Sequence, residues 1–258
     1  MYWYDVILRI KDRLPKFTKR WLSGLYDRWA IDKKILKDLM EYYDMSKEEV
    51  MCMLKLGRRL NMELWNILSP KTEKEILKFY EHTPFYVFDL IYWHTRISQK
   101  MFRKEVIKIA KGDILDYGAG VGDLCLELAK KGHRVTYADI YGKTFEFAKW
   151  LFERRRVRIR MIDLSRHDIE KEERYDTIIC IDVIEHVLDQ KSLLKKLVKH
   201  LRPGGFLIIT HLKSDEIPED YPMHFKIEFD AEDYLFSLGL VKKKEWLWIK
   251  NELTYGLE

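Results

Sequence analysis

The sequence lacks the features of a membrane-spanning or exported chain. Hydrophobic residues make up 47% of the 258 positions, yet charged residues interrupt every apolar run. No run approaches the roughly 20 consecutive apolar residues that a membrane-spanning helix needs. The first residues also lack the basic-then-apolar order of a cleaved signal peptide. We therefore expect a globular, cytoplasmic protein.

Cysteine and side-chain amides are scarce as well. The three cysteines, Cys52, Cys125 and Cys180, share no CxxC spacing and fall inside apolar patterns. This predicts reduced core thiols rather than a disulfide framework. Only two glutamines and three asparagines accompany 47 basic and 42 acidic residues. That bias is typical of thermophile proteins, so we expect a heat-loving source.

Excess positive charge is confined to the N-terminus. Residues 1–37 hold ten Lys and Arg against four Asp and Glu, and the remaining 221 residues are close to neutral. Aromatic residues share this segment, among them Trp3, Tyr4, Trp21, Tyr26 and Trp29. Such a composition suits a helix pair packed on the rest of the chain, a helix on an anionic membrane surface, or nucleic-acid binding. All three interpretations stay open, with peripheral membrane contact ahead of nucleic acid.

The N-terminal part of the chain has the apolar spacing of helices. The spacing recurs in three segments: 35–43, 50–68 and 75–80. Ser46 followed by Glu49 is a capping-box pattern and predicts a helix that begins near Lys47. We therefore predict an all-helical cap over residues 1–110.

From Lys111 onward, short β-branched runs alternate with amphipathic segments. Strands are predicted within 113–118, 133–140, 157–164, 175–182, 206–211 and 240–249. Helices are predicted within 121–132, 144–156, 190–200 and 230–238, with a turn at 202–205. Strands that alternate with helices form a parallel sheet, so residues 111–258 are predicted to be a Rossmann-like α/β domain.

A glycine loop follows the first predicted strand. Glycines at 118, 120 and 122 come after Asp116 and before a helix, and this arrangement lets the backbone approach a nucleoside ligand closely. A dinucleotide fingerprint would need a further glycine where Asp123 stands. Aspartates on both sides of the loop would repel a pyrophosphate, but they suit a ligand with ammonium and sulfonium centres. The charges favour a sulfonium methyl donor over a dinucleotide.

Two further strands also end in acids. Asp139 lies about twenty residues beyond the loop, where an acidic side chain takes the ribose hydroxyls of a nucleoside. Asp163 ends the next strand and is positioned to receive an adenine amino group. Three acids at three successive strand ends indicate one edge of the sheet, the edge where open α/β sheets bind ligands.

Five segments together resemble the successive motifs of class I S-adenosylmethionine-dependent methyltransferases. They are DYGAGVGD, YADI, MIDL, YDTIICIDVIEHV and LRPGGFLIIT, in family order. The resemblance implies that Asp116, Gly118 and Gly120, with Gly122 in the same loop, contact the methionine part of the cofactor. It implies further that Asp139 contacts the ribose, that Ile140, Asp163 and Leu164 contact the adenine, and that backbone near Asp182 closes the pocket. Family members end in a two-strand hairpin, so we expect the last strand here to be very short or absent.

The segment CIDVIEHV places Asp182, Glu185 and His186 just past the fourth strand as candidate catalytic residues. It resembles the acid-x-x-Glu-His group of two branches, the ubiquinone-biosynthesis O-methyltransferases and the small-RNA 3′-terminal 2′-O-methyltransferases, which bind a divalent metal there. A later histidine, His211 or His224, would complete such a site. A structural or general-base role for Glu185 and His186 is the alternative.

Two aromatic segments are candidate covers for the acceptor. One is 79–99, where five side chains are available to line a pocket: His82, Tyr86, Tyr92, Trp93 and His94. The other is 213–229, with Pro218, Tyr221, Pro222, His224 and Phe225. Packing within the protein is the alternative for both segments.

The sequence thus predicts a methyltransferase for a small or lipid-like acceptor, modified at oxygen. The alternatives are an RNA 2′-O-methyltransferase and a non-catalytic nucleoside-binding scaffold or sensor. The near-neutral charge of the predicted catalytic domain disfavours RNA. Neither the acceptor nor the oligomeric state follows from the sequence.

Overall fold

The computed structural model describes residues 31–213 and 221–252. Residues 1–30, 214–220 and 253–258 lie outside that description. The N-terminal aromatic residues named above therefore lie outside it too: Trp3, Tyr4, Trp21, Tyr26 and Trp29.

Within the described ranges, no helix is both long enough and apolar enough to cross a membrane.

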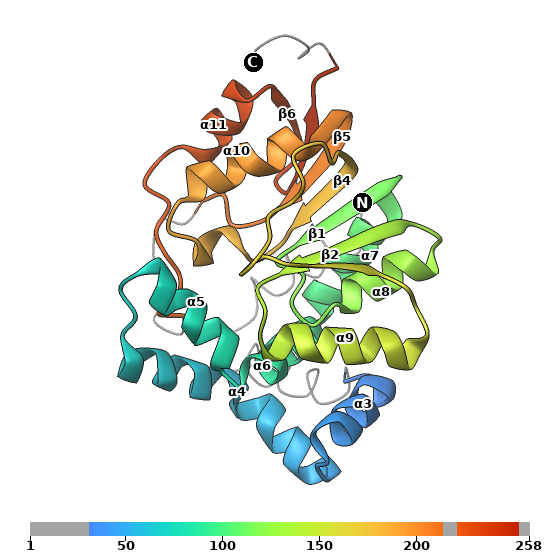
Figure 1. Cartoon of the computed structure of the whole chain (residues 1–258), viewed down its shortest axis with the longest axis vertical. Helices are drawn as coiled ribbons and strands as arrows, with labels where there is room; N and C mark the ends of the chain where they lie inside the picture. The colour runs from blue at the N-terminus through green and yellow to red at the C-terminus, as the bar shows by residue number, and fades with distance from the viewer. Residues whose placement is uncertain (1–30, 214–220, 253–258) are drawn as a thin grey trace, which may run out of the picture.

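Five described helices precede the sheet. They are α3 (Lys33–Tyr43), α4 (Lys47–Leu68), α5 (Glu73–His82), α6 (Tyr86–His94) and α7 (Ile97–Ile109). Ser46 accepts a hydrogen bond from the Glu49 N–H and donates its own N–H to the Glu49 carboxylate, so the predicted capping box is confirmed as the start of α4. Gly57 allows α4 to pack closely on α6, because a Cβ there would lie 2.9 Å from the backbone nitrogen of Asp89. In Figure 1, α3 to α6 gather at one end of the molecule, opposite the C-terminal strands.

The rest of the chain forms a seven-stranded sheet. Its strands are β1 (Asp113–Tyr117), β2 (Arg134–Asp139), β3 (Arg160–Asp163), β4 (Tyr175–Cys180), β5 (Leu201–Ile209), β6 (Leu240–Lys244) and β7 (Leu247–Lys250). They lie in the order β3-β2-β1-β4-β5-β7-β6. The first five are parallel, and β7 is antiparallel to both of its neighbours. The predicted Rossmann-like α/β architecture, preceded by helices, is confirmed.

The end of the chain differs from its prediction. The segment predicted as one strand, 240–249, is a hairpin in which β6 pairs with β7. The final family strand, expected to be very short or absent, is present as β7 and has four residues. The two residues between the strands, Glu245 and Trp246, include no glycine or proline. Because no turn residue interrupts the β-type pattern, the sequence does not reveal where the chain reverses.

The predicted turn at 202–205 is also part of a strand. Leu201 pairs with Tyr175, and Phe206 pairs with Thr177. The four residues between Leu201 and Phe206 therefore form an irregularity inside β5, and Gly204 supplies a positive φ of 69° there.

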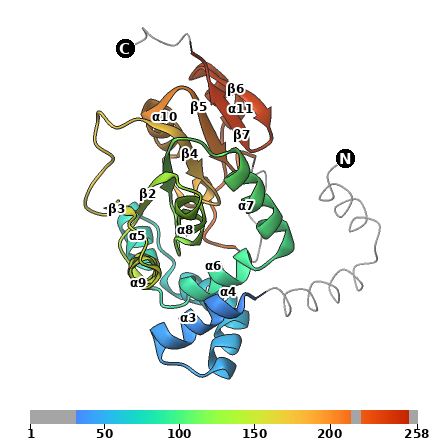
Figure 2. The same cartoon turned by 90° about the vertical axis from the view of Figure 1, so that its right-hand side faces the viewer.

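Helices cover both faces of the sheet. On one face, α7, α8 (Asp123–Lys130) and α9 (Lys143–Arg155) pack on β1 and β2 through a shared apolar cluster. On the other face, a second cluster joins α10 (Gln190–His200) and α11 (Ala231–Ser237) to β4, β5 and β7. Figure 2 shows α7 and α8 side by side on their face of the sheet.

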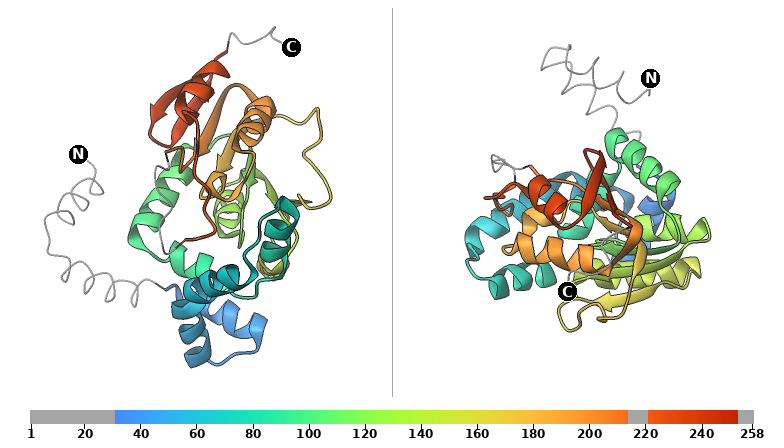
Figure 3. Two further views of the ribbon diagram at one scale, coloured as in Figure 1. Left: turned by 90° about the vertical axis from the view of Figure 1, so that its left-hand side faces the viewer. Right: turned by 90° about the horizontal axis from the view of Figure 1, so that it is seen from above.

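The connection between β3 and β4, residues 164–174, forms a wide loop at one side of the molecule (Figure 3), and its Ile169 is buried in the second apolar cluster. All three cysteines are free. Cys125 and Cys180 are buried as predicted, but Cys52 is exposed, so the prediction of a core thiol is wrong at that position. Cys52 faces outward because α4 buries a different stripe of residues, including Val50 and Leu54.

Candidate active site

The loop after β1 holds three glycines in the left-handed backbone region. Their φ angles are 71° at Gly118, 54° at Gly120 and 71° at Gly122, a conformation that other residues adopt only with strain. A Cβ at Gly118 would collide with the side chain of Val183, and one at Gly122 would lie 2.5 Å from Phe152. At Gly120 the only described atom within 4 Å of such a Cβ is a terminal carbon of Leu90. Of the three loop glycines, Gly120 is therefore the one at which an added side chain would contact the fewest protein atoms.

Asp139 ends β2 directly beside this loop. Its carboxylate accepts hydrogen bonds from the backbone N–H groups of Gly120, at 2.5 Å, and Ile140, at 2.7 Å. Burial raises the pKa of Asp139 to about 7, although the two backbone donors oppose that shift. No cationic side chain pairs with Asp139 among the described residues. A buried carboxylate without a cation fits a ligand that brings hydroxyl donors, as a ribose does.

Asp116 and Asp123 flank the loop in different electrostatic states. Asp116 is buried within β1, accepts a hydrogen bond from the Cys125 thiol at 3.1 Å, and has its pKa raised to about 6 by burial. Burial also opposes ionisation of Asp123, but Arg103 at 2.6 Å and His94 at 3.0 Å lower its pKa well below the usual range. The charge of Asp123 is thus already neutralised by the protein. The acids at the loop without an ionic partner among the described residues are Asp116 and Asp139.

Asp163 ends β3, next to the end of β2. One carboxylate oxygen accepts from the N–H groups of Ser165, at 2.9 Å, and Tyr141, at 3.2 Å. The N–H of Leu164 donates to the carbonyl of Asp139 at 2.8 Å. These bonds tie the two strand ends together. Ile140 and Leu164, which follow the two strands, are half-buried.

The ends of β4 and β5 carry a second group of polar side chains. Asp182 and His211 both have positive φ angles, 55° and 58°, and such strain in non-glycine residues is concentrated at functional sites. The Asp182 carboxylate accepts from the hydroxyl of Thr210 at 2.9 Å and from the indole N–H of Trp93 at 3.0 Å. His211 Nε2 lies 3.2 Å from the same carboxylate. Burial would raise the pKa of Asp182, but these partners lower it to about 2.

Glu185 lies beneath this pair and is almost fully buried. One of its oxygens is 3.3 Å from His211 Nε2, and the other has no hydrogen-bond partner among the described residues. Burial raises the pKa of Glu185 to about 7. Burial alone would lower the pKa of His211, but Asp182 and Glu185 raise it to about 9. The group therefore contains an ionised aspartate, a histidine cation and a carboxyl poised near neutrality.

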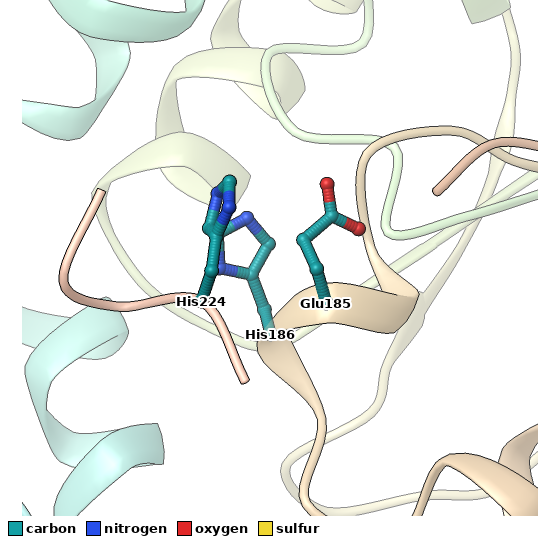
Figure 4. A group of neighbouring side chains, drawn as sticks. All are labelled: Glu185, His186 and His224. Atoms are coloured by element: carbon teal, nitrogen blue, oxygen red, sulfur yellow. The ribbon is translucent and has the colours of Figure 1, made fainter. Parts of the chain in front are cut away.

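His186 follows Glu185 in a short 3-10 helix, η1 (Ile184–His186). Its Nδ1 lies 2.8 Å from the hydroxyl of Tyr80 and 3.3 Å from the carbonyl of Met223. The His224 ring packs edge-on against the His186 ring, with centroids 4.7 Å apart, and Glu185 lies on the other side (Figure 4). Burial lowers the pKa of His186 to about 3 and that of His224 to about 4, so both rings are neutral at pH 7.

These side chains form two overlapping groups whose oxygen and nitrogen atoms lie close enough to hold one metal ion. One group is Glu185, His186 and His224, and the other is Asp182, Glu185 and His211. In each group the candidate ligand atoms lie within 4.8 Å of one another. Asp182 is therefore grouped with His211 rather than with His186 and His224, and Glu185 belongs to both groups.

The N-terminal helices cover this second group. Tyr80 and Trp65 pack together with Met223 and Phe225 in an apolar cluster that joins α4 and α5 to the segment after β5. Phe225 donates its N–H to the carbonyl of Glu185 at 2.6 Å, which fixes the segment above η1. Pro218 lies outside the described residues.

The side chains of segment 79–99 that the sequence offered for lining a pocket have different surroundings in the structure. Trp93 contacts Asp182, Tyr86 is packed against Tyr80, and His94 binds Asp123. His82 is largely exposed and binds the carbonyl of its own helix at Lys78, 2.9 Å away, so it does not line the group at β4 and β5. Tyr92 is half-buried.

Sequence reasoning missed Tyr80, Thr210 and Arg58. Arg58 donates to the Tyr221 hydroxyl at 3.2 Å, and the Tyr221 ring stacks on His224 with centroids 4.9 Å apart. Nothing in the sequence singles out these three residues. They lie in ordinary helix and strand patterns, and their partners are 28 to 163 positions away.

Comparison with known proteins agrees with this architecture. The profile of a family described as methyltransferase domain matches residues 92–245. Ubiquinone biosynthesis O-methyltransferases from Rickettsia akari and Rickettsia conorii are 35% and 34% identical over 102 and 121 residues. These matches cover 40% and 45% of this chain, and 41% and 42% of the two relatives. The chain thus aligns with about two fifths of their length.

Solved structures give weaker matches. The structure titled StiE O-MT residues 961–1257 is 20% identical, with a TM-score of 0.47 over 59% of this chain and 55% of that one. A S-adenosylmethionine-dependent methyltransferase from Clostridium acetobutylicum is 21% identical, with a TM-score of 0.37 over 43% and 46%. Because the family profile covers more than half of the chain, and the glycine loop and strand-end acids lie along one parallel sheet, this chain belongs to the class I S-adenosylmethionine-dependent methyltransferases and is an enzyme of that family.

Proposed function

We propose that this enzyme transfers the methyl group of S-adenosylmethionine to a hydroxyl oxygen of a small or lipid-like acceptor. The observation that carries the proposal is the group of acids and histidines at the ends of β4 and β5. It lies on the same sheet edge as the glycine loop, and aromatic side chains of the N-terminal helices cover it. The O-methyltransferase names of the Rickettsia relatives agree with an oxygen acceptor.

The cofactor residues proposed from the sequence fit one end of this edge. Asp116, Gly118, Gly120 and Gly122 would hold the methionine part, and Asp139 the ribose. Ile140, Asp163 and Leu164 would hold the adenine, with backbone near Asp182 closing the pocket. Buried carboxylates without cations fit a ligand that carries ammonium, sulfonium and hydroxyl groups. The cofactor supplies an activated methyl group on sulfur.

An oxygen acceptor needs a group that takes up its proton. A phenolic hydroxyl has a pKa of about 10 and becomes a good nucleophile only when it loses that proton. Glu185 offers a buried oxygen without a hydrogen-bond partner among the described residues. Asp182 is held in place by Thr210 and Trp93. We assign the catalytic role to Asp182, Glu185 and His186. Glu185, whose pKa is raised to about 7, would accept the proton, whereas Asp182 and His186 have lowered pKa values and would position it. Orientation of the acceptor falls to the covering side chains.

A divalent metal is part of the proposal. Asp182, Glu185, His186 and His224 are the ligands proposed from the sequence. The geometry favours Glu185, His186 and His224 as one set, because Asp182 is grouped with His211, whose ring is a cation at pH 7. The neutral rings of His186 and His224 offer nitrogen lone pairs, as metal binding requires. A bound metal would lower the pKa of an acceptor hydroxyl and orient it.

We propose the same division of the chain as above, with residues 1–110 a cap that selects the acceptor and residues 111–258 the catalytic domain. Tyr80 and Trp93 support this division, because both come from the helical part and contact residues of the β4 and β5 ends. Peripheral membrane contact through the basic aromatic N-terminus remains a prediction.

Calorimetric titration of Mg²⁺, Mn²⁺ and Zn²⁺ into the S-adenosylhomocysteine-bound protein tests the metal. We expect stoichiometric binding by wild type and by His133→Ala, which alters a histidine at the opposite edge of the sheet, and none by His186→Ala. S-adenosylhomocysteine release from a panel of catechols, phenols, amines and RNA 3′ ends tests the acceptor. Release with amines alone would refute oxygen transfer, and release with RNA alone would promote the RNA alternative.

A further inference from the structure

Tyr86, the first residue of α6, adjoins both ends of the ligand-binding edge. Its ring centroid lies 5.2 Å from that of Tyr80, whose hydroxyl reaches His186 at the β4–β5 end. Tyr86 also packs on the same apolar cluster as Ile140, which follows β2 at the other end. A single side chain of the helical part is therefore placed where the two ends meet.

The charges around Tyr86 indicate the same position. Burial raises the pKa of its hydroxyl well above the usual value, and the carboxylates of Asp139 and Glu185 both add to the shift. Asp139 is the acid proposed for the ribose, and Glu185 is the proposed proton acceptor. The Tyr86 hydroxyl thus stays protonated at pH 7 and lies within the field of both acids.

The Tyr86 hydroxyl is available to a ligand. Within residues 31–213 and 221–252 it has no hydrogen-bond partner, whereas the Tyr80 hydroxyl is bonded to His186. Tyr86 is only half-buried, so part of its surface is uncovered. A hydroxyl in such a place takes its partner from water or from a bound ligand.

The chemistry of the cofactor determines which of its atoms lie between these two acids. The sulfur of S-adenosylmethionine is bonded to carbon C5′ of the ribose, and the methyl group on that sulfur must face the acceptor. With the ribose at Asp139 and the acceptor at Glu185, the sulfonium centre lies between them.

We propose that Tyr86 contacts the sulfonium centre and its methyl group, and that this contact favours S-adenosylmethionine over S-adenosylhomocysteine. The hydroxyl oxygen and the face of the ring both carry partial negative charge, so both attract a cation. Transfer of the methyl group leaves a neutral thioether, and the attraction is lost in the product. The inference rests on the cofactor placement proposed above and is independent of the acceptor and the metal.

Calorimetric titration of S-adenosylmethionine and of S-adenosylhomocysteine into the full-length protein, without acceptor, tests the contact. The two ligands differ only in the methyl group and its charge, so a loosened fold weakens both and leaves the ratio of their affinities unchanged. In Tyr86→Phe, we expect this ratio to shift against S-adenosylmethionine by about three- to tenfold. Tyr86→Leu also removes the ring and should shift the ratio further, to about thirtyfold.

Tyr43→Phe is the matched control. The Tyr43 hydroxyl also has no hydrogen-bond partner among the described residues, but its ring packs against Phe88 in the main core. Both affinities should equal those of wild type in this control. A ratio that is unchanged in both Tyr86 variants would overturn the inference, even if the two affinities fall together.

Gly120→Val, titrated with the same two ligands, separates the inference from the cofactor placement. If Gly120→Val binds neither ligand while the ratio is unchanged in the Tyr86 variants, the placement stands and the inference alone is wrong. If Gly120→Val binds both ligands as wild type does, the placement fails and the inference fails with it.

Discussion

The two ends of the ligand-binding edge are built in different ways. At the β1–β2–β3 end, Asp139 is held by the backbone N–H groups of Gly120 and Ile140, all within twenty-odd positions of one another. At the β4–β5 end, Asp182 is held by Trp93 and Thr210, 89 and 28 positions away. The first end is built mainly from local backbone, and the second from side chains of distant elements. We therefore expect changes at the first end to alter cofactor affinity and changes at the second to alter turnover.

Among the variants that test this comparison, Gly120→Val should have the largest effect. A Val side chain at a φ of 54° is strained, and it occupies the space where the proposed ligand approaches the backbone. We expect S-adenosylhomocysteine affinity to fall by at least about a hundredfold in calorimetry. Gly132→Val is the control, since Gly132 also has a positive φ but no described atom within 4 Å of its Cβ position. Retained affinity in Gly120→Val would place the cofactor elsewhere.

Glu185→Gln should separate turnover from cofactor binding. The change preserves shape but removes a buried carboxylate from the proton-accepting group, so we expect the turnover rate to fall about 10²–10³-fold. The S-adenosylhomocysteine dissociation constant should stay unchanged, as should both quantities in Glu170→Gln, an exposed control. If cofactor affinity falls in parallel with turnover, the two ends are not independent.

Asp139→Asn should weaken S-adenosylhomocysteine binding by about 10–100-fold, because hydrogen bonds to a charged group are lost. The wild-type pKa is raised to about 7, and ribose hydroxyls favour the ionised carboxylate, so wild-type affinity should rise as the pH increases from 6 to 8. Calorimetry in buffers of different ionisation enthalpy should detect the released proton. A pH dependence that survives in Asp139→Asn would assign the titration to another group.

The same raised pKa predicts a trend in stability. Above the unfolded pKa of about 3.9, the unfolded chain ionises Asp139 more readily than the folded protein does. Asp139 therefore favours the folded state at low pH, and this contribution is lost as the pH rises through about 7. Thermal unfolding of the ligand-free proteins tests this. Between about pH 4 and pH 7, the unfolding temperature should fall less in Asp139→Asn than in wild type.

Tyr80→Phe should have the smallest effect. It removes one hydrogen bond, between the Tyr80 hydroxyl and His186, so we expect turnover to fall about three- to tenfold with cofactor affinity unchanged. Tyr175→Phe is the control, because it removes a comparable bond to Glu173 at the opposite edge of the sheet. Equal turnover in the two variants would show that α5 covers the site without influencing the histidine.

The sequence predicted most of the sheet because its signals are local. Strand, glycine loop and helix follow one another within a few residues at β1 and α8. An apolar run bounded by a turn residue can be recognised from the sequence alone. The hairpin of β6 and β7 and the irregularity in β5 were missed for the same reason. In the hairpin the chain reverses without glycine or proline, and in β5 the residues Pro203 and Gly204 are present but the strand pairing resumes beyond them.

Electrostatic reasoning from the sequence was only partly correct. The sequence shows that Asp116 and Asp123 flank the loop, but it does not show which of them is paired. Arg103 is 20 positions from Asp123 and His94 is 29 positions away, and folding brings both to it. The acids that remain without ionic partners among the described residues are Asp116 and Asp139. Since Asp139 suits ribose hydroxyls, Asp116 is the acid beside the loop that is left to face a cationic group.

By itself, the sequence determined the fold family, the glycine loop and the order of the acids along the sheet edge, because these depend on neighbours in the chain. Only the tertiary structure decided which histidine meets which acid. Asp182, Glu185, His186, His211 and His224 are brought together by the ends of two strands and a later segment. Tyr80 and Trp93 complete that group from helices about a hundred positions earlier. Side-chain contacts across such separations follow from packing, and sequence spacing does not encode them.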